Sequence, residues 1–517
     1  MRARRLRIGV IDLIGKSPAR DPYSLLMRTN NTSLMAQVVC VWCQEAGHDV
    51  HIAYYSGPAI VAGGLPKALD LLFITAFTQC AHLAYALSAL YRSRGVPTVL
   101  GGPHARSFPE DAQRYFDYVV GLCDRTTLQA ILAEPVPHRP LGHRLSAPRQ
   151  PVNLPGLRQR WPFLEAAMDK APVIKVVPII GSLGCPYTCC FCVDASVSYQ
   201  PLDFDVMRDD LRFFASLSLR GGVANWQDPN FGIRFDQYLD MIEEAVRPGS
   251  ITFVAETSLS LLQEPNLRRL RRNGFAFIAP GIESWYEMGG KSRVQRTCGV
   301  AKVRRVAEHA RMVNAYIPYT QCNVIFGLDS DEGHEPFELT KQFADLAPGV
   351  YPHYAILTAF GRNAEGNRNH QADGRVLPVP FEFLDLVEAM NVVPKHYPWD
   401  SFYDGVCGAY EHAFSARAIA RRAWANRRSI IAFEQVFRSV TSDHFNRLRY
   451  HRRMQRWVAT DPEVRAFFHG ETTTVPTVMR AQVRRHLGPL WEWLPDQSLQ
   501  YDANAYLHAT SAMAPVG

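Results

Sequence analysis

The sequence lacks the features that mark a membrane-spanning or secreted protein. No apolar run approaches the roughly 20 residues that a membrane-spanning helix needs. The charged start of the chain is followed by an apolar stretch that is too short for a signal peptide and that Asp12 interrupts. The 11 cysteines are odd in number and four of them lie within residues 185–192, whereas a disulfide framework spaces its cysteines in pairs. We therefore expect a soluble, cytoplasmic protein without a membrane span.

A nucleic-acid-binding signature is also missing. The chain has no basic tail, and its net charge of +7 is concentrated in residues 411–490, which hold 15 arginines and 6 acidic residues. Such a segment can contact an anionic substrate, although a solvated helical face is the more common reason for it. We expect no nucleic-acid partner.

The composition is that of a folded protein, with 47% hydrophobic and 20% charged residues, and the length of 517 residues suggests about three domains. Short apolar runs alternate with helical patterns through residues 1–132. The expected strands there are 7–11, 51–55, 70–75, 98–100 and 118–120, and the expected helices are 34–46 and 82–94. This alternation predicts an α/β, doubly wound domain with a parallel sheet, whose ligands bind at the carboxyl ends of the strands.

The remaining chain divides into three parts. Residues 133–172 are rich in proline and arginine, and we expect a linker there. Residues 173–395 alternate again, and their six strand–helix units predict a partial (β/α)6 barrel. Its expected strands are 174–180, 223–227, 251–256, 276–280, 321–326 and 354–358. Residues 396–517 are mainly helical in pattern, which predicts a helical cap over the barrel mouth that selects the substrate.

One motif concentrates the chemistry: Cys185-Pro-Tyr-Thr-Cys189-Cys190-Phe191-Cys192, soon after the first expected barrel strand. Its C-x3-C-x2-C spacing supplies three thiolates, which are ligands for iron–sulfur clusters or zinc. Structural zinc usually takes four ligands in two separated pairs, and no second pair is present. Three ligands on one loop leave an open metal position, which favours a 4Fe–4S cluster that binds a substrate at one iron. Cys190 is expected to point away from the cluster.

This motif resembles the signature of the radical S-adenosylmethionine (radical SAM) enzymes, and the resemblance covers about residues 173–360. In that family SAM binds the open iron, and one electron from the reduced cluster cleaves it to a 5′-deoxyadenosyl radical. The resemblance implies that Cys185, Cys189 and Cys192 hold the cluster and that Phe191 packs near the adenine. It also implies cofactor-binding roles for three residues at strand ends. Asp228 would bind the SAM amine, although the family's Gly-Gly-Glu is replaced here, and Glu283 and Ser284 would contact the ribose or carboxylate.

The first domain resembles the cobalamin-binding domain of cobalamin-dependent radical SAM proteins. The residues behind this resemblance lie in 70–77, 99–105 and 115–121. Glycines allow the backbone to approach a flat corrin or its nucleotide tail closely, so Gly101 and Gly102 are expected to contact it, and Thr75 to hydrogen-bond the tail. The Asp-x-His-x-x-Gly motif that supplies an axial histidine is absent, as it is in many relatives. A degenerate remnant of such a domain is the alternative.

The domain order predicts a cobalamin-dependent radical SAM enzyme that methylates an unactivated carbon of a small-molecule or natural-product substrate. Its cofactors would be a 4Fe–4S cluster, SAM and cobalamin, with electrons from a low-potential flavodoxin- or ferredoxin-type donor. Two alternatives stay open: a radical SAM cyclase, oxidase or rearrangement enzyme without methyl transfer, and a non-catalytic iron–sulfur protein. Aromatic residues of the cap are candidates to line a pocket for a bulky, aromatic or anionic substrate, although such stripes are more often core. They are Tyr403, Tyr410, Trp424, Phe433 and Phe437.

Overall fold

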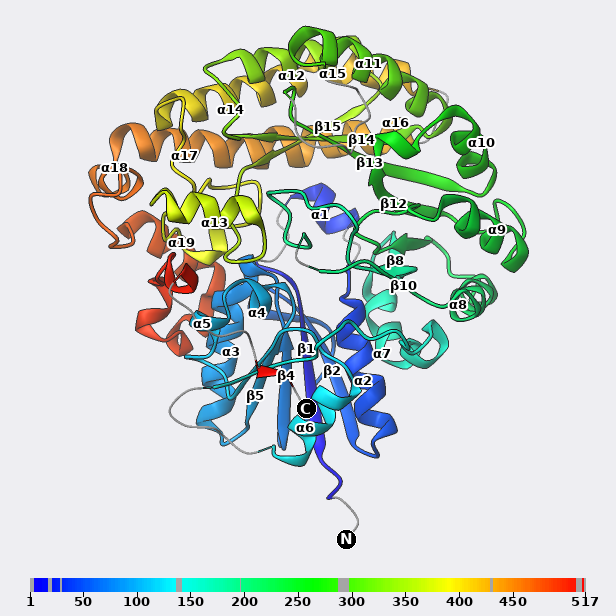
Figure 1. The fold of residues 1–517 in the computed structure, drawn as a ribbon, viewed down its shortest axis with the longest axis vertical. Helices are drawn as coiled ribbons and strands as arrows, with labels where there is room; N and C mark the ends of the chain where they lie inside the picture. The colour runs from blue at the N-terminus through cyan, green and yellow to red at the C-terminus, as the bar shows by residue number, and fades with distance from the viewer. Residues whose placement is uncertain are drawn as a thin grey trace.

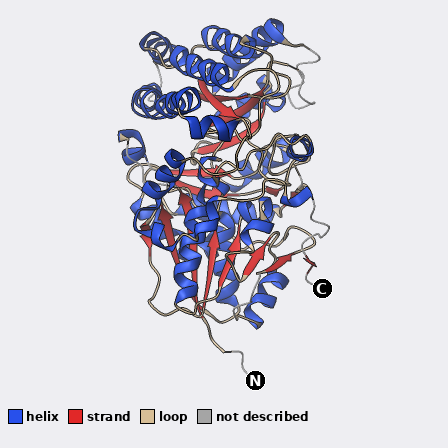
Figure 2. Cartoon of the chain, turned by 90° about the vertical axis from the view of Figure 1, so that its left-hand side faces the viewer, coloured by secondary structure: helices blue, strands red, loops and turns tan. Residues whose placement is uncertain are grey.

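Two sheets of mostly parallel strands lie one above the other along the long axis of the molecule (Figures 1 and 2). The computed structural model describes residues 4–16, 21–27, 30–135, 142–195, 197–286, 297–427, 431–507 and 514–515. The first sheet fills the lower half of Figure 1, and helices arch around the second sheet in the upper half. The short helix α1 (Pro22–Met27) lies between the two sheets.

The first sheet has eight strands, and every neighbouring pair is parallel except the antiparallel pair β2–β3. In order across the sheet they are β16 (Ala514–Pro515), β7 (His143–Ser146), β6 (Tyr118–Val120), β5 (Thr98–Gly101), β4 (Leu71–Thr75), β1 (Arg7–Gly15), β2 (Asp49–Ser56) and β3 (Ala59–Gly63). The strand order reverses at β1, which pairs with β2 on one side and β4 on the other. Ligands of open α/β sheets bind at the carboxyl ends of the strands at such a point.

Helices cover both faces of this sheet because successive side chains of a strand point to opposite sides. Ile8 and Val10 of β1 pack into one apolar cluster, whereas Ile11 and Leu13 pack into another. The first cluster includes α2 (Leu34–Glu45) and α6 (Arg125–Ala133), and the second includes α3 (Ala81–Ser93), α4 (Pro103–Ser107) and α5 (Pro109–Ala112). The predicted doubly wound arrangement is confirmed.

Residues 133–172, expected to be a linker, contain regular structure. Strand β7 extends the first sheet beside β6, and α7 (Leu157–Lys170) buries one apolar face. Leu164 and Met168 of α7 are fully buried among residues of α2 and of the second sheet. The prolines fall mostly before the helix, so they delimit these elements and do not loosen the segment.

The second sheet has six parallel strands and forms the predicted partial barrel. In order they are β8 (Lys175–Ile179), β11 (Gly222–Trp226), β12 (Phe253–Ser258), β13 (Phe275–Glu283), β14 (Tyr319–Phe326) and β15 (Tyr351–Ile356). The helices that connect them form the outer arch of Figure 1: α8 (Phe204–Ser216), α9 (Phe235–Ala245), α10 (Glu264–Arg272), α11 (Gly299–Tyr316) and α12 (Glu335–Leu346). Trp226, Phe253 and Phe275 stack beneath them with ring centroids 5.0–6.2 Å apart. These rings lie on the outer face of the sheet. Because side chains alternate along a strand, the residues next to them in each strand face the inner, concave side.

The last third of the described chain is helical, as expected. Its helices are α13 (Glu365–Ala372), α14 (Trp399–Ala413), α15 (Ala416–Ala425), α16 (Ile431–Arg438), α17 (Leu448–Thr460), α18 (Pro462–Phe468) and α19 (Thr477–Leu487). A π-helical stretch, Ser439–Arg447, joins α16 to α17. No helix in the described part of the chain is long and apolar enough to cross a membrane.

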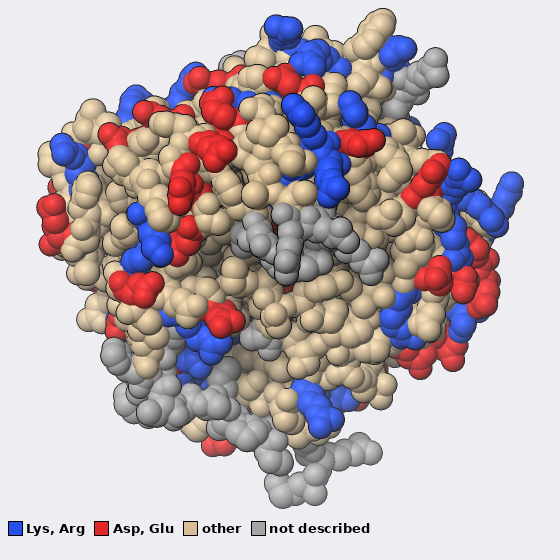
Figure 3. Space-filling view, turned by 45° about the horizontal axis from the view of Figure 1, so that its top comes forward, with Lys and Arg blue, Asp and Glu red and all other residues tan. Residues whose placement is uncertain are grey.

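The arginine-rich segment of this region does not form one basic face. Arg421 pairs with Asp345 at 2.7 Å and Arg452 with Glu411 at 2.8 Å, and Arg422 is buried. On the face drawn in Figure 3, basic and acidic side chains are interspersed. Four of these arginines, at positions 421, 438, 447 and 452, are therefore paired with neighbouring acids.

Candidate functional site

The cysteines lie on a loop that leaves the carboxyl end of β8. This cysteine loop, residues 181–199, starts with the two-residue strand β9 (Ser182–Leu183), which pairs with β10 (Gln200–Pro201). Gly184 adopts φ +65°, and a Cβ there would lie 2.6 Å from the carbonyl oxygen of Val197 and closer still to that of Ser198. Only glycine fits this backbone conformation without displacing the neighbouring strand, and it directs the chain into Cys185.

None of the four cysteines of the loop forms a disulfide. Cys185 is buried, Cys189 and Cys192 are partly buried, and Cys190 is exposed. The N–H of Asp194 donates to the sulfur of Cys192 at 3.5 Å. Among the described side chains, no three His, Cys, Asp or Glu residues are already gathered at metal-binding distance. The donor set nevertheless fits an iron–sulfur cluster, because three soft thiol ligands share one loop and none is consumed by a disulfide.

Asp228, predicted to bind the SAM amine, is engaged by protein donors. Its carboxylate accepts the N–H of Gly181 at 2.8 Å, the hydroxyl of Ser182 at 2.6 Å and the hydroxyl of Tyr238 at 2.8 Å. Burial raises the pKa of Asp228 to about 6, and these hydrogen bonds lower it in part. The described contacts make Asp228 a brace for the first turn of the cysteine loop. Sequence reasoning placed it near the cluster but missed Tyr238, which lies on α9.

Glu283 and Ser284 lie together at the end of β13. Glu283 adopts φ +66°, a strained conformation for a residue with a side chain, and its carboxylate occupies the space that a side chain on Gly281 would fill. Ser284 is buried, and its carbonyl oxygen accepts a hydrogen bond from the ammonium nitrogen of Lys302, 2.6 Å away. Strain of this kind clusters at functional sites, which fits the predicted role of this strand end.

Glu256 is a polar residue of the inner face that was not among the predicted site residues. It is exposed, whereas its neighbours Ala255 and Thr257 are buried, so its carboxylate points to the concave side of the sheet. The protein around that space raises the pKa of Glu256 by desolvation. Strand register places it opposite Ala279, beyond which Gln321 continues the same row. The available signal in the sequence was a charged residue near the end of an otherwise uncharged strand, 253–258.

The glycine pair of the first sheet divides into two different roles. A Cβ on Gly102 (φ +93°) would lie 2.9 Å from both the carbonyl of Ala76 and the hydroxyl of Thr75, so Gly102 packs against the end of β4. A Cβ on Gly101 would meet nothing within 4 Å. Gly101 thus leaves open space beside the partly exposed Thr75 and the exposed ring of Phe77. An open backbone next to an apolar ring fits a large flat ligand such as a corrin.

The aromatic residues of the cap, which were candidates to line a pocket, do not line one pocket, and two of them pack in the core as such stripes more often do. Tyr403 and Tyr410 are buried in the core, whereas Trp424 and Phe433 are 69% and 75% exposed. Phe437 stacks on Phe433 at 6.2 Å. They do not converge because α14, α15 and α16 present different faces to the core.

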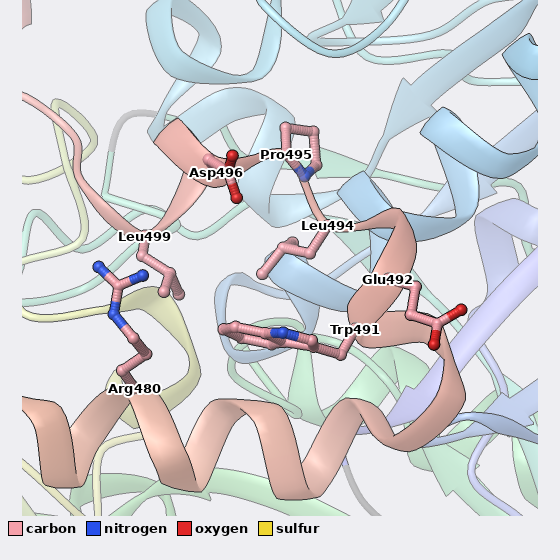
Figure 4. A pocket seen from close by; sticks show the side chains of 7 residues that line it. All are labelled: Arg480, Trp491, Glu492, Leu494, Pro495, Asp496 and Leu499. Carbon is pink, nitrogen blue, oxygen red and sulfur yellow. The ribbon is translucent and has the colours of Figure 1, made fainter.

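A surface pocket of about 340 Å³ lies between α19 and the turns that follow it (Figure 4). It contains none of the predicted site residues, and its lining comes entirely from residues 480–499. The lining residues are Arg480, Trp491, Glu492, Leu494, Pro495, Asp496 and Leu499.

Two curated methyltransferases are similar to most of the chain. No protein family model matches the chain. Bacteriochlorophyllide d C-8(2)-methyltransferase of Chlorobaculum tepidum is 28% identical over 388 residues, covering 70% of this chain and 81% of that enzyme. The C-12(1)-methyltransferase of the same organism is 22% identical, covering 64% of this chain and 68% of that enzyme. The radical S-adenosylmethionine methyltransferase TsrM of Kitasatospora setae, solved with cobalamin and a 4Fe–4S cluster, has a TM-score of 0.49 and 12% identity, covering 72% of this chain and 78% of that chain.

The chain resembles curated methyltransferases. This similarity agrees with the resemblance that the cysteine motif predicted, and the prediction that the chain is an enzyme is confirmed. The predicted fold class is confirmed as well, because both sheets and the helical C-terminal region are present in the described chain.

Proposed function

We propose that the chain is a cobalamin-dependent radical SAM methyltransferase that acts on a tetrapyrrole-derived small molecule. The observation that carries the proposal is the C-x3-C-x2-C motif on the loop after β8, in a chain similar to a curated methyltransferase over 70% of its length. When bound, the cluster supplies an electron to SAM and cobalamin carries the methyl group. The protein supplies ligands, orientation and exclusion of water.

In this proposal Cys185, Cys189 and Cys192 hold the cluster. Phe191 packs beside the adenine, since its ring already lies against the larger apolar cluster of the protein. Glu283 and Ser284 contact the ribose or the SAM carboxylate. Asp228 holds the start of the cysteine loop through its hydrogen bonds from Gly181 and Ser182, and it does not need to contact SAM itself.

Cobalamin is proposed to bind at the carboxyl ends of β4 and β5. Gly101 offers the open backbone, Thr75 a hydroxyl for the nucleotide tail, and Gly102 a tight turn that keeps the two strand ends together. Residues 1–132 would then form the cobalamin-binding domain and residues 173–395 the radical SAM barrel. Residues 133–172 join them, and residues 396–517 cap the barrel.

The proposed substrate class rests on the relatives and on exposed apolar side chains. The curated relatives methylate bacteriochlorophyllide d, a flat chlorin. Leu25 and Leu26 of α1 are 54% and 53% exposed, and Phe77 after β4 is 49% exposed. Exposed large apolar side chains suit a flat, largely apolar ligand. Electrons are proposed to come from a low-potential protein of the flavodoxin or ferredoxin type.

The test uses protein purified anaerobically from cobalamin-fed cells and incubated with SAM, a strong reductant and bacteriochlorophyllide d. We expect near-stoichiometric cobalamin, together with one S-adenosylhomocysteine and one 5′-deoxyadenosine for each methylated product. 5′-Deoxyadenosine without S-adenosylhomocysteine or methylated product would replace methyl transfer by other radical chemistry. A cluster whose EPR spectrum SAM leaves unchanged would indicate a non-catalytic iron–sulfur protein.

A further inference from the structure

Helix α4 is firmly attached to the strand ends that are proposed to face cobalamin. It begins directly after Gly101 and Gly102, and the close packing of Gly102 on Thr75 and Ala76 leaves no freedom at that turn. The N–H of His104 donates to the carbonyl of Ala76 at 3.1 Å. The position of α4 is therefore set by the ends of β4 and β5.

The same helix holds the cysteine loop by an ion pair. Arg106 of α4 contacts Asp194 with 3.1 Å between guanidinium nitrogen and carboxylate oxygen, and the two side chains are 19% and 28% exposed. Partial shelter from water makes such a pair stronger than an exposed one. Asp194 in turn donates its N–H to the sulfur of Cys192. A continuous set of contacts thus runs from the first sheet to a proposed cluster ligand.

A second route joins α4 to the loop through the segment before α13. The amide of Asn363 donates to the hydroxyl of Ser107, the last residue of α4, at 2.7 Å. Three residues later the N–H of Gly366 donates to the carbonyl of Cys190 at 3.0 Å, and a Cβ on Gly366 would lie only 2.6 Å from that oxygen. In Figure 1, α4 and α13 lie next to each other at the junction of the two sheets. Two independent contacts therefore hold the loop on either side of Cys192, at Cys190 and at Asp194.

We infer that α4 sets the position of the cluster relative to cobalamin, and that Arg106 is a positioning residue for methyl transfer. The inference rests on the proposed function, and it concerns coupling between the two cofactor sites, not the binding of either cofactor. A substrate radical formed at the cluster side must meet the methyl donor at contact distance. A displacement of about 1 Å lowers the rate of such a step by roughly 100-fold. Radical formation at SAM itself needs only the cluster and the barrel, so it is less sensitive to α4.

The test replaces each partner of the ion pair and measures coupling. In Arg106→Gln and Asp194→Asn we expect wild-type iron content and SAM cleavage within about twofold, but about tenfold more 5′-deoxyadenosine per methylated product. The charge-swapped double variant, Arg106→Asp with Asp194→Arg, should recover part of the coupling. Arg452→Gln, which breaks an exposed ion pair with Glu411, is the matched control and should leave the ratio unchanged.

A second measurement is independent of turnover. In the full chain carrying its cluster, hydrogen–deuterium exchange of residues 185–195 should speed up in Arg106→Gln and not in Arg452→Gln. The inference is overturned if the product ratio stays at the wild-type value in both single variants, or if iron content falls in parallel with product, which would make the pair a folding contact. If wild-type protein makes no methylated product, the proposed function fails. Unchanged hydrogen–deuterium exchange of residues 185–195 in Arg106→Gln would separately show that the Arg106–Asp194 ion pair does not hold the cysteine loop.

Discussion

Replacing Gly184 by alanine would place a methyl group where the cysteine loop leaves no room. Two costs arise. Gly184 lies at φ +65°, where a residue with a Cβ costs about 1 kcal/mol. The new Cβ would also lie 2.6 Å from the carbonyl of Val197, so the backbone must move by about 1 Å to reach an ordinary contact. Because that carbonyl accepts the N–H of Cys185, the shift is transmitted directly to a cluster ligand.

The two costs can be separated by a matched glycine. Gly470 adopts φ +74°, and a Cβ there meets nothing within 4 Å, so Gly470→Ala carries the backbone strain without the steric displacement. Gly470→Ala should lower the stability of the chain by about 1 kcal/mol, and Gly184→Ala should lower it by more because the steric cost adds to the backbone strain. Only Gly184→Ala should disturb the cluster, because only its Cβ pushes on the loop.

The assay measures iron and sulfide per chain after reconstitution and the rate of 5′-deoxyadenosine formation. We expect Gly184→Ala to retain its cluster poorly or to cleave SAM about 100-fold more slowly, and Gly470→Ala to match wild type in both measurements. If Gly184→Ala loads its cluster and cleaves SAM like wild type, then the loop geometry does not control the cluster and the reasoning is refuted.

Three further predictions follow from the same structure. Cys189→Ala should abolish cluster binding and SAM cleavage, whereas exposed Cys190→Ala should keep both; iron content and 5′-deoxyadenosine assays check this. Burial raises the pKa of Asp12 from 3.8 to about 7, although two hydrogen bonds from Ser33 partly lower it. The protonated carboxyl therefore contributes stability that is complete below about pH 4 and is lost as the pH rises through 7. Asp12→Asn should flatten that dependence, by up to about 4 kcal/mol, in thermal unfolding measured from about pH 4 to pH 8. Gly101→Leu should fold normally, because its Cβ direction is open, but should retain much less cobalamin after gel filtration than wild type.

The central strands of both sheets were predictable because buried parallel strands appear as short apolar runs. The edge strands β3, β7 and β16 of the first sheet were not predicted. Gly47 and Gly95, which follow α2 and α3, adopt φ +88° and +77° as the helix ends require. The proposed cluster ligands could be named from the sequence because metal-ligand spacing is local in sequence.

Contacts between residues far apart in the chain could not be predicted in this way. Arg106 and Asp194 are 88 residues apart, and nothing near either residue indicates its partner. Tyr238 reaches Asp228 only because α9 packs beneath β11. The expectation that Asp228 binds the SAM amine depended on its position at a strand end. That position does not reveal how many protein donors already contact its carboxylate.

The two sheets form one body, and this bears on how the reaction is organised. Each of the two large apolar clusters contains residues of both sheets, so neither half keeps a complete core alone. Lys16, directly after β1, is partly buried and pairs with Asp385 at 2.7 Å and with Glu388 at 3.2 Å, so separating the two sheets would break these ion pairs. The strand β16 at the C-terminal end closes the edge of the first sheet beside β7. The shared core consequently fixes the two sheets relative to each other, and with them the loops that carry the proposed cobalamin and cluster sites.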